Sequence, residues 1–119
     1  MPIQNLDQLR AKHALARKDD VSRSTDAEKK EGNQVSGYPA MIIADGLLSA
    51  LAISIEKKDQ RLRVANAIAY HLKESGTFNS QPVTAEGLLK ALTTSDDYTL
   101  RRVTAESLAL LSFLKRFVG

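Results

Sequence analysis

The stretch YPAMIIADGLLSALAISI, residues 38–55, decides the fold. Its large apolar side chains lie on nearly all sides of a helical wheel: Met41, Ile42, Ile43, Leu47, Leu48, Leu51, Ile53 and Ile55. A helix that is apolar all round is buried, because a surface helix keeps a polar face toward water. Pro39 suits the first turn of such a helix, where a missing N–H costs little. The stretch therefore predicts one helix over residues 38–55, in the middle of a helical bundle.

Amphipathic helical patterns stand on both sides of this segment. The pattern before it runs from Asn5 to about Lys18, with Asn5 as N-cap and Gln8 at the position that completes a capping box. Its predicted inward-facing residues are Leu6, Leu9, His13, Ala14 and Ala16. Three more patterns follow the central stretch, and the residues that mark their ends are Asp59, Gly76, Thr84 and Asp96. The last one repeats apolar residues at intervals of three and four as far as Phe117.

No strand pattern is sustained anywhere, so the fold class is predicted to be all-α: a single-domain bundle of about five helices over residues 1–119. Between residues 19 and 37 the composition shifts to Asp, Ser, Glu, Lys, Gly and Asn, with Val21 and Val35 as the only large apolar residues. Such a segment buries little surface. We expect a frayed helix end followed by a mobile charged loop.

Composition excludes several classes of protein. Hydrophobic residues make up 43% and charged residues 26% of the chain, which is ordinary usage for a folded domain. Zero cysteines exclude disulfides, thiolate metal sites and a cysteine nucleophile. The longest apolar stretch is interrupted by Asp45 and Ser49, so we expect no membrane contact. Residues 1–12 lack the apolar centre of a signal peptide, which predicts a cytoplasmic location.

The charge balance permits binding to a polyanion. Seventeen Lys and Arg against fourteen Asp and Glu give a net charge of +3. Six aromatic residues and no Trp are too few for a base-stacking platform, so a nucleic-acid contact would involve mostly phosphates. Arg101 and Lys115 share a helix face, as do Arg102 and Arg116. A solvated face, with Arg102 paired to Glu106 at i,i+4, explains the same pattern.

Local enzyme motifs are missing from the sequence. It has no Gly-rich phosphate loop, no G-x-S-x-G elbow and no H-E-x-x-H. His71 and Glu74 lie one turn apart, but a metal needs three or four converging ligands, so we predict partly buried or surface imidazoles at His13 and His71. We expect no catalysis and no cofactor. A hydrolase or nuclease would need distant carboxylates, such as Asp45 and Glu106, to converge.

Three segments together resemble a known family. They are NLDQLRAKHALA at residues 5–16, YPAMIIADGLLSALA at residues 38–52 and YTLRRVTAESLALLSFLKRF at residues 98–117. They resemble the small all-helical subunit of the Cmr-type, type III-B CRISPR effector complex. The last segment is the most specific, because its Thr-Ala-Glu, apolar run and Leu-Lys-Arg-Phe are similar to that family's ending in order and spacing. Phe113 stands where the family often has Trp.

The resemblance implies a non-catalytic subunit for antiviral defence. Several copies would stack head to tail beside the backbone subunit and near the large subunit, forming a wall along the target RNA and guide RNA. The predicted phosphate contacts are Lys115 and Arg116 first, then Arg10, Lys12, Arg17 and Lys18, then Arg101 and Arg102. A different class of function also fits the sequence: a freestanding helical adaptor or regulator that binds a partner helix in an apolar groove.

Overall fold

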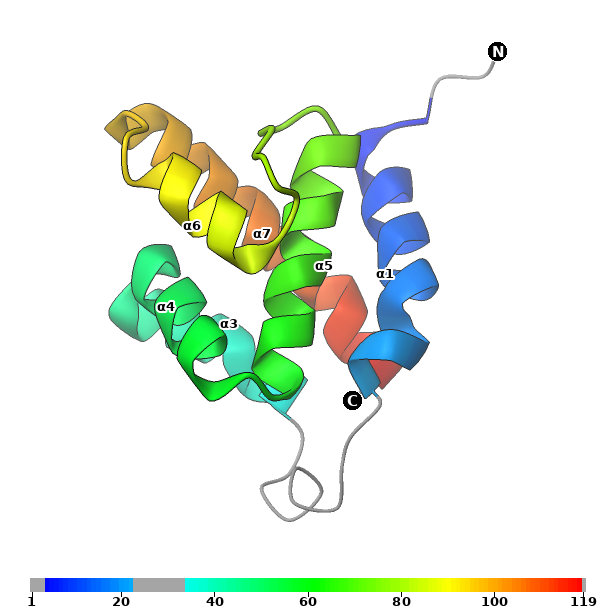
Figure 1. The fold of residues 1–119 in the computed structure, drawn as a ribbon. Helices are drawn as coiled ribbons and strands as arrows, with labels where there is room; N and C mark the ends of the chain where they lie inside the picture. The colour runs from blue at the N-terminus through cyan, green and yellow to red at the C-terminus, as the bar shows by residue number, and fades with distance from the viewer. Residues whose placement is uncertain (1–3, 23–33, 119) are drawn as a thin grey trace.

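Six α-helices make up the described part of the chain, residues 4–22 and 34–118 of a computed structural model (Figure 1). They are α1 Leu6–Ser22, α3 Gln34–Asp45, α4 Leu47–Lys57, α5 Gln60–Glu74, α6 Ala85–Leu92 and α7 Asp97–Val118. No strand occurs in these ranges. The predicted all-α class is confirmed, with one helix more than expected because the central stretch is divided.

Gly46 divides the stretch that we predicted to be a single helix. Its φ of 89° lies in the left-handed region, which favours glycine because other residues carry a Cβ that clashes there. The Gly46 N–H donates to the carbonyl of Ile42 at 2.8 Å, and its own carbonyl accepts from Ala50 at 3.1 Å. The chain therefore ends one helix and begins the next without leaving these backbone groups unpaired. Because α3 begins at Gln34, Pro39 lies inside that helix and not in its first turn.

The central place in the bundle belongs to α5 and not to residues 38–55. Helix α5 packs against all five other helices and lies in the middle of the ribbon (Figure 1). It is rich in small apolar residues on its buried sides, such as Ala65 and Ala69, which let neighbours approach closely. Helices α3 and α4 lie on the outside, where Ile43 is 75% exposed. Residues 38–55 therefore lie nearer the surface of the bundle than we predicted.

The ends of the predicted mobile loop are helical. Residues 19–22 belong to α1 and residues 34–37 to α3, and both Val21 and Val35 are fully buried. Gln60 holds these two ends together: its Nε2 donates to the carbonyl of Val21 at 2.9 Å and its Oε1 accepts from the N–H of Gln34 at 2.7 Å. The loop expected near residues 19–37, after a helix end, is therefore wrong for residues 34–37, which belong to α3, and residues 23–33 lie outside the described part of the chain.

Three of the predicted helix starts, those at Asn5, Asp59 and Thr84, are confirmed by their caps. Asn5 and Gln8 exchange two hydrogen bonds of 2.8 Å between side chain and backbone, which is a capping box. Asp59 accepts from the N–H of Arg61, and Thr84 accepts from the N–H of Gly87. Gly76, with φ 75°, follows the end of α5. In α1, however, Leu6 and Ala16 are exposed, while Val21 reaches the core.

The buried apolar side chains form one core cluster that draws on all six helices. In the part of the chain that is described, no helix is both long enough and apolar enough to cross a membrane.

Candidate nucleic-acid interface

The last turn of α7 carries Lys115 and Arg116, the two residues that the sequence placed first. Both side chains are exposed, whereas Leu110, Leu111 and Leu114 of the same helix are buried and fix its rotation. The two cations therefore face away from the core. They also stand at a helix C-terminus, where the helix dipole favours positive charge.

A hollow of about 620 Å³ lies beside these two cations and is lined by Ser36, Ser112, Lys115 and Arg116. It is formed between the first turn of α3 and the last turns of α7. The Ser112 hydroxyl donates its proton to the carbonyl of Ala109 at 3.0 Å, so within the hollow its oxygen is an acceptor and not a donor. The groups in this lining that can donate to phosphate oxygens are therefore the two cations, Lys115 and Arg116.

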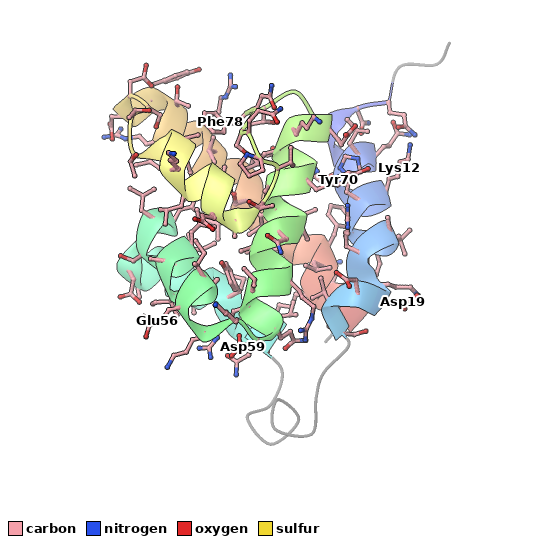
Figure 2. The ribbon with its side chains drawn as sticks, in the orientation of Figure 1. Lys12, Asp19, Glu56, Asp59, Tyr70 and Phe78 are labelled. Carbon is pink, nitrogen blue, oxygen red and sulfur yellow. The ribbon has the colours of Figure 1, made fainter. Side chains whose placement is uncertain are left out.

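Helix α1 ends at the same end of the molecule as α7 (Figure 1), and the two helices pack against each other. Lys18, within the last two turns of α1, is exposed. We call Lys18, Lys115 and Arg116 the cationic end. The next residues of α1, Asp19 and Asp20, are also exposed and offset part of its charge; Asp19 points away from the bundle (Figure 2).

The other two cations of α1 that the sequence singled out beside Arg10 are Lys12, about two turns before Lys18, and Arg17, directly before it. Lys12 is exposed and points into solvent (Figure 2). The guanidinium carbon of Arg17 lies 4.2 Å from the centre of the Tyr70 ring, an attractive contact between a cation and the face of an aromatic ring. Arg17 is therefore held against α5 and is only partly exposed.

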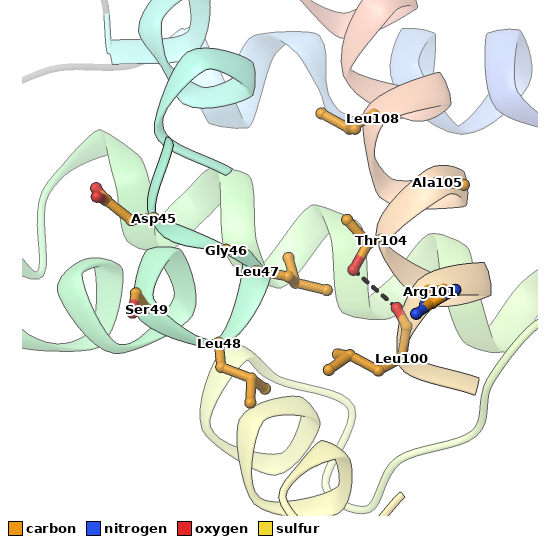
Figure 3. Close-up of a pocket in the computed structure, with 10 residues that line it drawn as sticks. All are labelled: Asp45, Gly46, Leu47, Leu48, Ser49, Leu100, Arg101, Thr104, Ala105 and Leu108. Atoms are coloured by element: carbon orange, nitrogen blue, oxygen red, sulfur yellow. Dashed lines mark hydrogen bonds between the residues drawn. The ribbon is translucent and has the colours of Figure 1, made fainter. Parts of the chain in front are cut away.

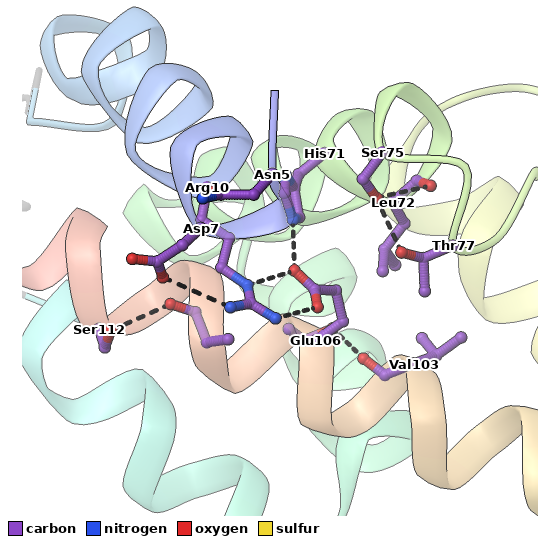
Figure 4. A network of polar contacts seen from close by, with 12 residues as sticks. Asn5, Asp7, Arg10, His71, Leu72, Ser75, Thr77, Val103, Glu106 and Ser112 are labelled. Carbon is purple, nitrogen blue, oxygen red and sulfur yellow. Dashed lines mark hydrogen bonds and ion pairs between the residues drawn. The ribbon is translucent and has the colours of Figure 1, made fainter. Parts of the chain in front are cut away.

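Arg10 is partly buried and pairs with a carboxylate of the protein itself. Its Nε donates to Oε2 of Glu106 at 2.8 Å and its Nη2 donates to Oε1 at 2.7 Å (Figure 4). The hydrogen bond to Glu106 is the main cause that raises the pKa of Arg10. The predicted pair of Arg102 with Glu106 is not formed, because Arg102 donates to the carbonyl of Thr77. Packing of α1 on α7 gives Glu106 a partner from across the bundle.

Arg101 and Arg102 lie near the opposite end of α7 from the cationic end. Fourteen residues at about 1.5 Å each separate Arg101 from Lys115, or roughly 21 Å along the helix axis. Arg101 also donates to Asp97 at 2.8 Å, and both side chains are well exposed. The shared helix face predicted from the spacing is therefore not one compact patch.

The first turn of α5 adds basic residues that were not among the predicted contacts. The hydrogen bond from Gln60 to Val21 places this turn beside the end of α1. It contains Arg61 and Arg63, but Arg61 donates through Nε to Asp59 at 3.1 Å. That side-chain hydrogen bond is the main cause that lowers the pKa of Asp59. The sequence signal for this group was the run of Lys and Arg around residues 57–63.

Both histidines are buried, contrary to the prediction of partly buried or surface imidazoles. His71 is fully buried and His13 is 7% exposed. Their Nδ1 atoms lie 2.7 Å apart, and Nε2 of His71 lies 2.7 Å from Oε2 of Glu106. Burial is the main cause that lowers the pKa of His13, and the charge of His71 adds to it. At no place in the described ranges do three or more His, Asp or Glu side chains form a group that could hold a metal ion.

Glu106 keeps a low pKa although it is 6% exposed. Burial favours the neutral acid, but hydrogen bonds from Arg10 and His71 outweigh that effect and lower the pKa of Glu106. Asp45 lies elsewhere: it lines a groove with Leu47, while Glu106 lines a separate hollow with Thr77. The structure therefore does not bring these two carboxylates into one site.

That groove lies between the α3–α4 junction and α7 and has a volume of about 600 Å³ (Figure 3). Its lining is mostly apolar, and the Thr104 hydroxyl within it donates to the carbonyl of Leu100 at 2.7 Å. The lining residues are Asp45, Gly46, Leu47, Leu48, Ser49, Leu100, Arg101, Thr104, Ala105 and Leu108. This surface suits a protein side chain better than a phosphate.

These features define a small all-helical protein with a cationic end and an apolar groove. The family model described as CRISPR-associated protein (Cas_Cmr5) matches residues 6–119. The chain therefore belongs to this family, the small subunit of the type III-B Cmr CRISPR complex. This confirms the resemblance seen in the sequence. Among curated proteins and among solved structures, no match was found.

Proposed function

We propose that this chain is a non-catalytic cytoplasmic subunit that contacts the phosphate backbone of target RNA during antiviral defence. It acts as one domain, in several copies stacked beside the backbone subunit and near the large subunit and guide RNA. The observation that carries the proposal is the hollow lined by Lys115, Arg116, Ser36 and Ser112. Side chains of this kind position phosphates without reading bases, as a subunit that holds any target sequence requires.

The predicted contacts contribute unequally in this proposal. Lys115 and Arg116 come first because both are exposed and line one hollow. Lys18 lies at the same end, Arg17 beside it is held against Tyr70, and Lys12 and Arg101 add charge at greater distance. Arg10 and Arg102 contribute least, because protein oxygens already accept hydrogen bonds from their guanidinium groups.

The test is target-RNA binding by the assembled complex over a range of salt concentrations. We expect Lys115→Ala with Arg116→Ala to weaken binding and to reduce the salt slope by about 1.4, from about 0.7 for each lost contact with single-stranded RNA. The matched control is Lys73→Ala with Lys90→Ala, which removes two exposed cations from the last turn of α5 and from α6. Unchanged binding by the first variant at every salt concentration would show that the proposed surface is wrong.

The apolar groove favours a second candidate function, an adaptor that binds a helix of a partner protein. Leu47, Leu48 and Leu108 line it, and leucines of this kind receive the apolar face of an amphipathic helix. The two functions differ in their sensitivity to salt, because apolar docking releases no counterions. A variant in the groove and a variant at the cationic end should therefore affect different measurements.

A further inference from the structure

A chain of four buried or part-buried polar side chains links α1 to α7, α7 to α5, and α5 back to α1. Arg10 of α1 donates to Glu106 of α7, Glu106 contacts His71 of α5, and His71 contacts His13 of α1. Arg10 and His13 are three residues apart and so lie on one face of α1. Figure 4 shows the part of this chain from Arg10 through Glu106 to His71. Both ends of this hydrogen-bonded chain, Arg10 and His13, are therefore residues of α1.

The protons in this chain can be assigned from the partners. Glu106 receives two N–H groups from Arg10, so it is a carboxylate and an acceptor only. Nε2 of His71 must then carry the proton in the 2.7 Å contact with Glu106. Between the two Nδ1 atoms, 2.7 Å apart, there is room for one proton only. Two lone pairs would repel there, and so would two N–H groups.

Counting protons shows which states this geometry accepts. With both imidazoles neutral, Nδ1–H of His13 donates to Nδ1 of His71. One further proton can bind at Nε2 of His13 and leaves the Nδ1 contact intact. A second further proton would have to occupy the remaining Nδ1, and the contact would be lost. The pair therefore accepts one positive charge but not two.

The groups around His13 come from all three helices. On α1 the cations Lys12 and Arg17 disfavour a charged imidazole, and on α5 Glu74 favours it. The Tyr70 ring packs edge-on against the His13 ring, with centroids 5.5 Å apart. On α7 the facing charged group is Glu106, which acts through His71. Desolvation of His13 also disfavours the charged form of its imidazole.

We propose that this chain is a pH-dependent latch, which holds α1 on α5 and α7 while the two imidazoles carry at most one positive charge and releases α1 when both are protonated. The latch does not depend on the proposed RNA contact. Because α1 carries Lys12, Arg17 and Lys18, its release would also displace those cations.

The test is amide hydrogen exchange of the full chain, isotope-labelled, between about pH 8 and pH 5, around the ordinary histidine pKa of about 6.5. Protection factors for residues 11–18 of α1 should fall below about pH 6.5, by up to tenfold per pH unit for each extra proton that the open state binds. Those in α4 and α6 should change less than twofold. Equal loss of protection in all helices, or none in α1, would overturn the latch.

A variant separates the latch from other effects of acid. His13→Gln keeps a donor for His71 but does not titrate, so α1 protection should lose most of its dependence on pH. Ala16→Gln, which introduces the same side chain at an exposed residue of the same helix, should retain it. If His13→Gln does not fold, the ¹⁵N shifts of the wild-type imidazoles decide. Two separated titration steps support the latch, and two rings that titrate independently overturn it.

Discussion

The guanidinium of Arg10 donates two hydrogen bonds, 2.8 and 2.7 Å long, to the carboxylate of Glu106. The two residues are 96 positions apart in the chain. The carboxylate is 6% exposed and the Arg10 side chain 23% exposed. The pair therefore lies at the solvent edge of the contact between α1 and α7. A buried carboxylate that loses such a partner keeps its charge without compensation, which is costly.

Removing the partner should accordingly destabilise the fold. We expect Arg10→Ala to lower the free energy of unfolding by about 2–3 kcal/mol, less than for a fully buried pair because Arg10 is partly exposed. Lys12→Ala, at an exposed position of the same helix, should change it by less than about 0.5 kcal/mol. Urea denaturation at neutral pH measures both. Equal midpoints for the two variants would show that the ion pair contributes nothing measurable.

Acid should destabilise the wild-type protein in two stages. The folded-state pKa of His13 is lowered, so below about 6.5 the unfolded chain binds more protons than the folded one and stability falls with pH. The pKa of Glu106 is also lowered, so a further loss follows below about 4.3 as that carboxylate protonates. Thermal unfolding midpoints across this pH range check the sign. Stability that rises on acidification would contradict both assignments.

Gly46 and Gly37 should respond in opposite ways to the same substitution. A Cβ meets nothing within 4 Å at either position, but Gly46 has φ +89° whereas Gly37 lies within helix α3. Gly46→Ala should therefore cost about 1–3 kcal/mol, from the positive φ of the backbone alone. Gly37→Ala should stabilise the protein by about 0.5–1 kcal/mol, because alanine loses less entropy in a helix. Urea denaturation of both variants measures the contrast, and equal effects would exclude a role for the Gly46 backbone.

Local signals predicted the helix ends well. The cap side chains of Asn5, Asp59 and Thr84 bind backbone groups two or three residues away, so their whole effect is visible in a short window of sequence. The start of α3 was missed because its anchor, Gln60, is 26 residues away from Gln34. The break at Gly46 was missed because an isolated glycine inside an apolar helical pattern is often tolerated.

The candidate site, like the fold, was predicted from the sequence only where its features are local. The exposure of Lys115 and Arg116 followed from the apolar stripe of their own helix, which periodicity reveals. The hollow beside them needs the first turn of α3, and the burial of His13 and His71 needs two helices whose contact spans 58 residues. Side chains that meet across such separations leave no local pattern. Sequence therefore indicated which cations are exposed but not which of them lie together.

The apolar groove gives the last prediction. Ala105 lines the groove on α7 and is exposed, so a charge there should leave the fold intact while opposing an apolar partner. We expect Ala105→Glu to weaken incorporation of the chain into the CRISPR complex at least tenfold, or about 1.4 kcal/mol.

The matched control is Ala52→Glu, at an exposed alanine of α4 that does not line the groove. Binding to the remaining purified subunits, measured at low and high salt, checks both variants. Because apolar contacts are less screened than ionic ones, the loss for Ala105→Glu should persist at high salt, where the effect of Lys115→Ala with Arg116→Ala fades. Incorporation of Ala105→Glu at the level of Ala52→Glu would exclude the groove as a docking surface and leave the cationic end as the better supported site.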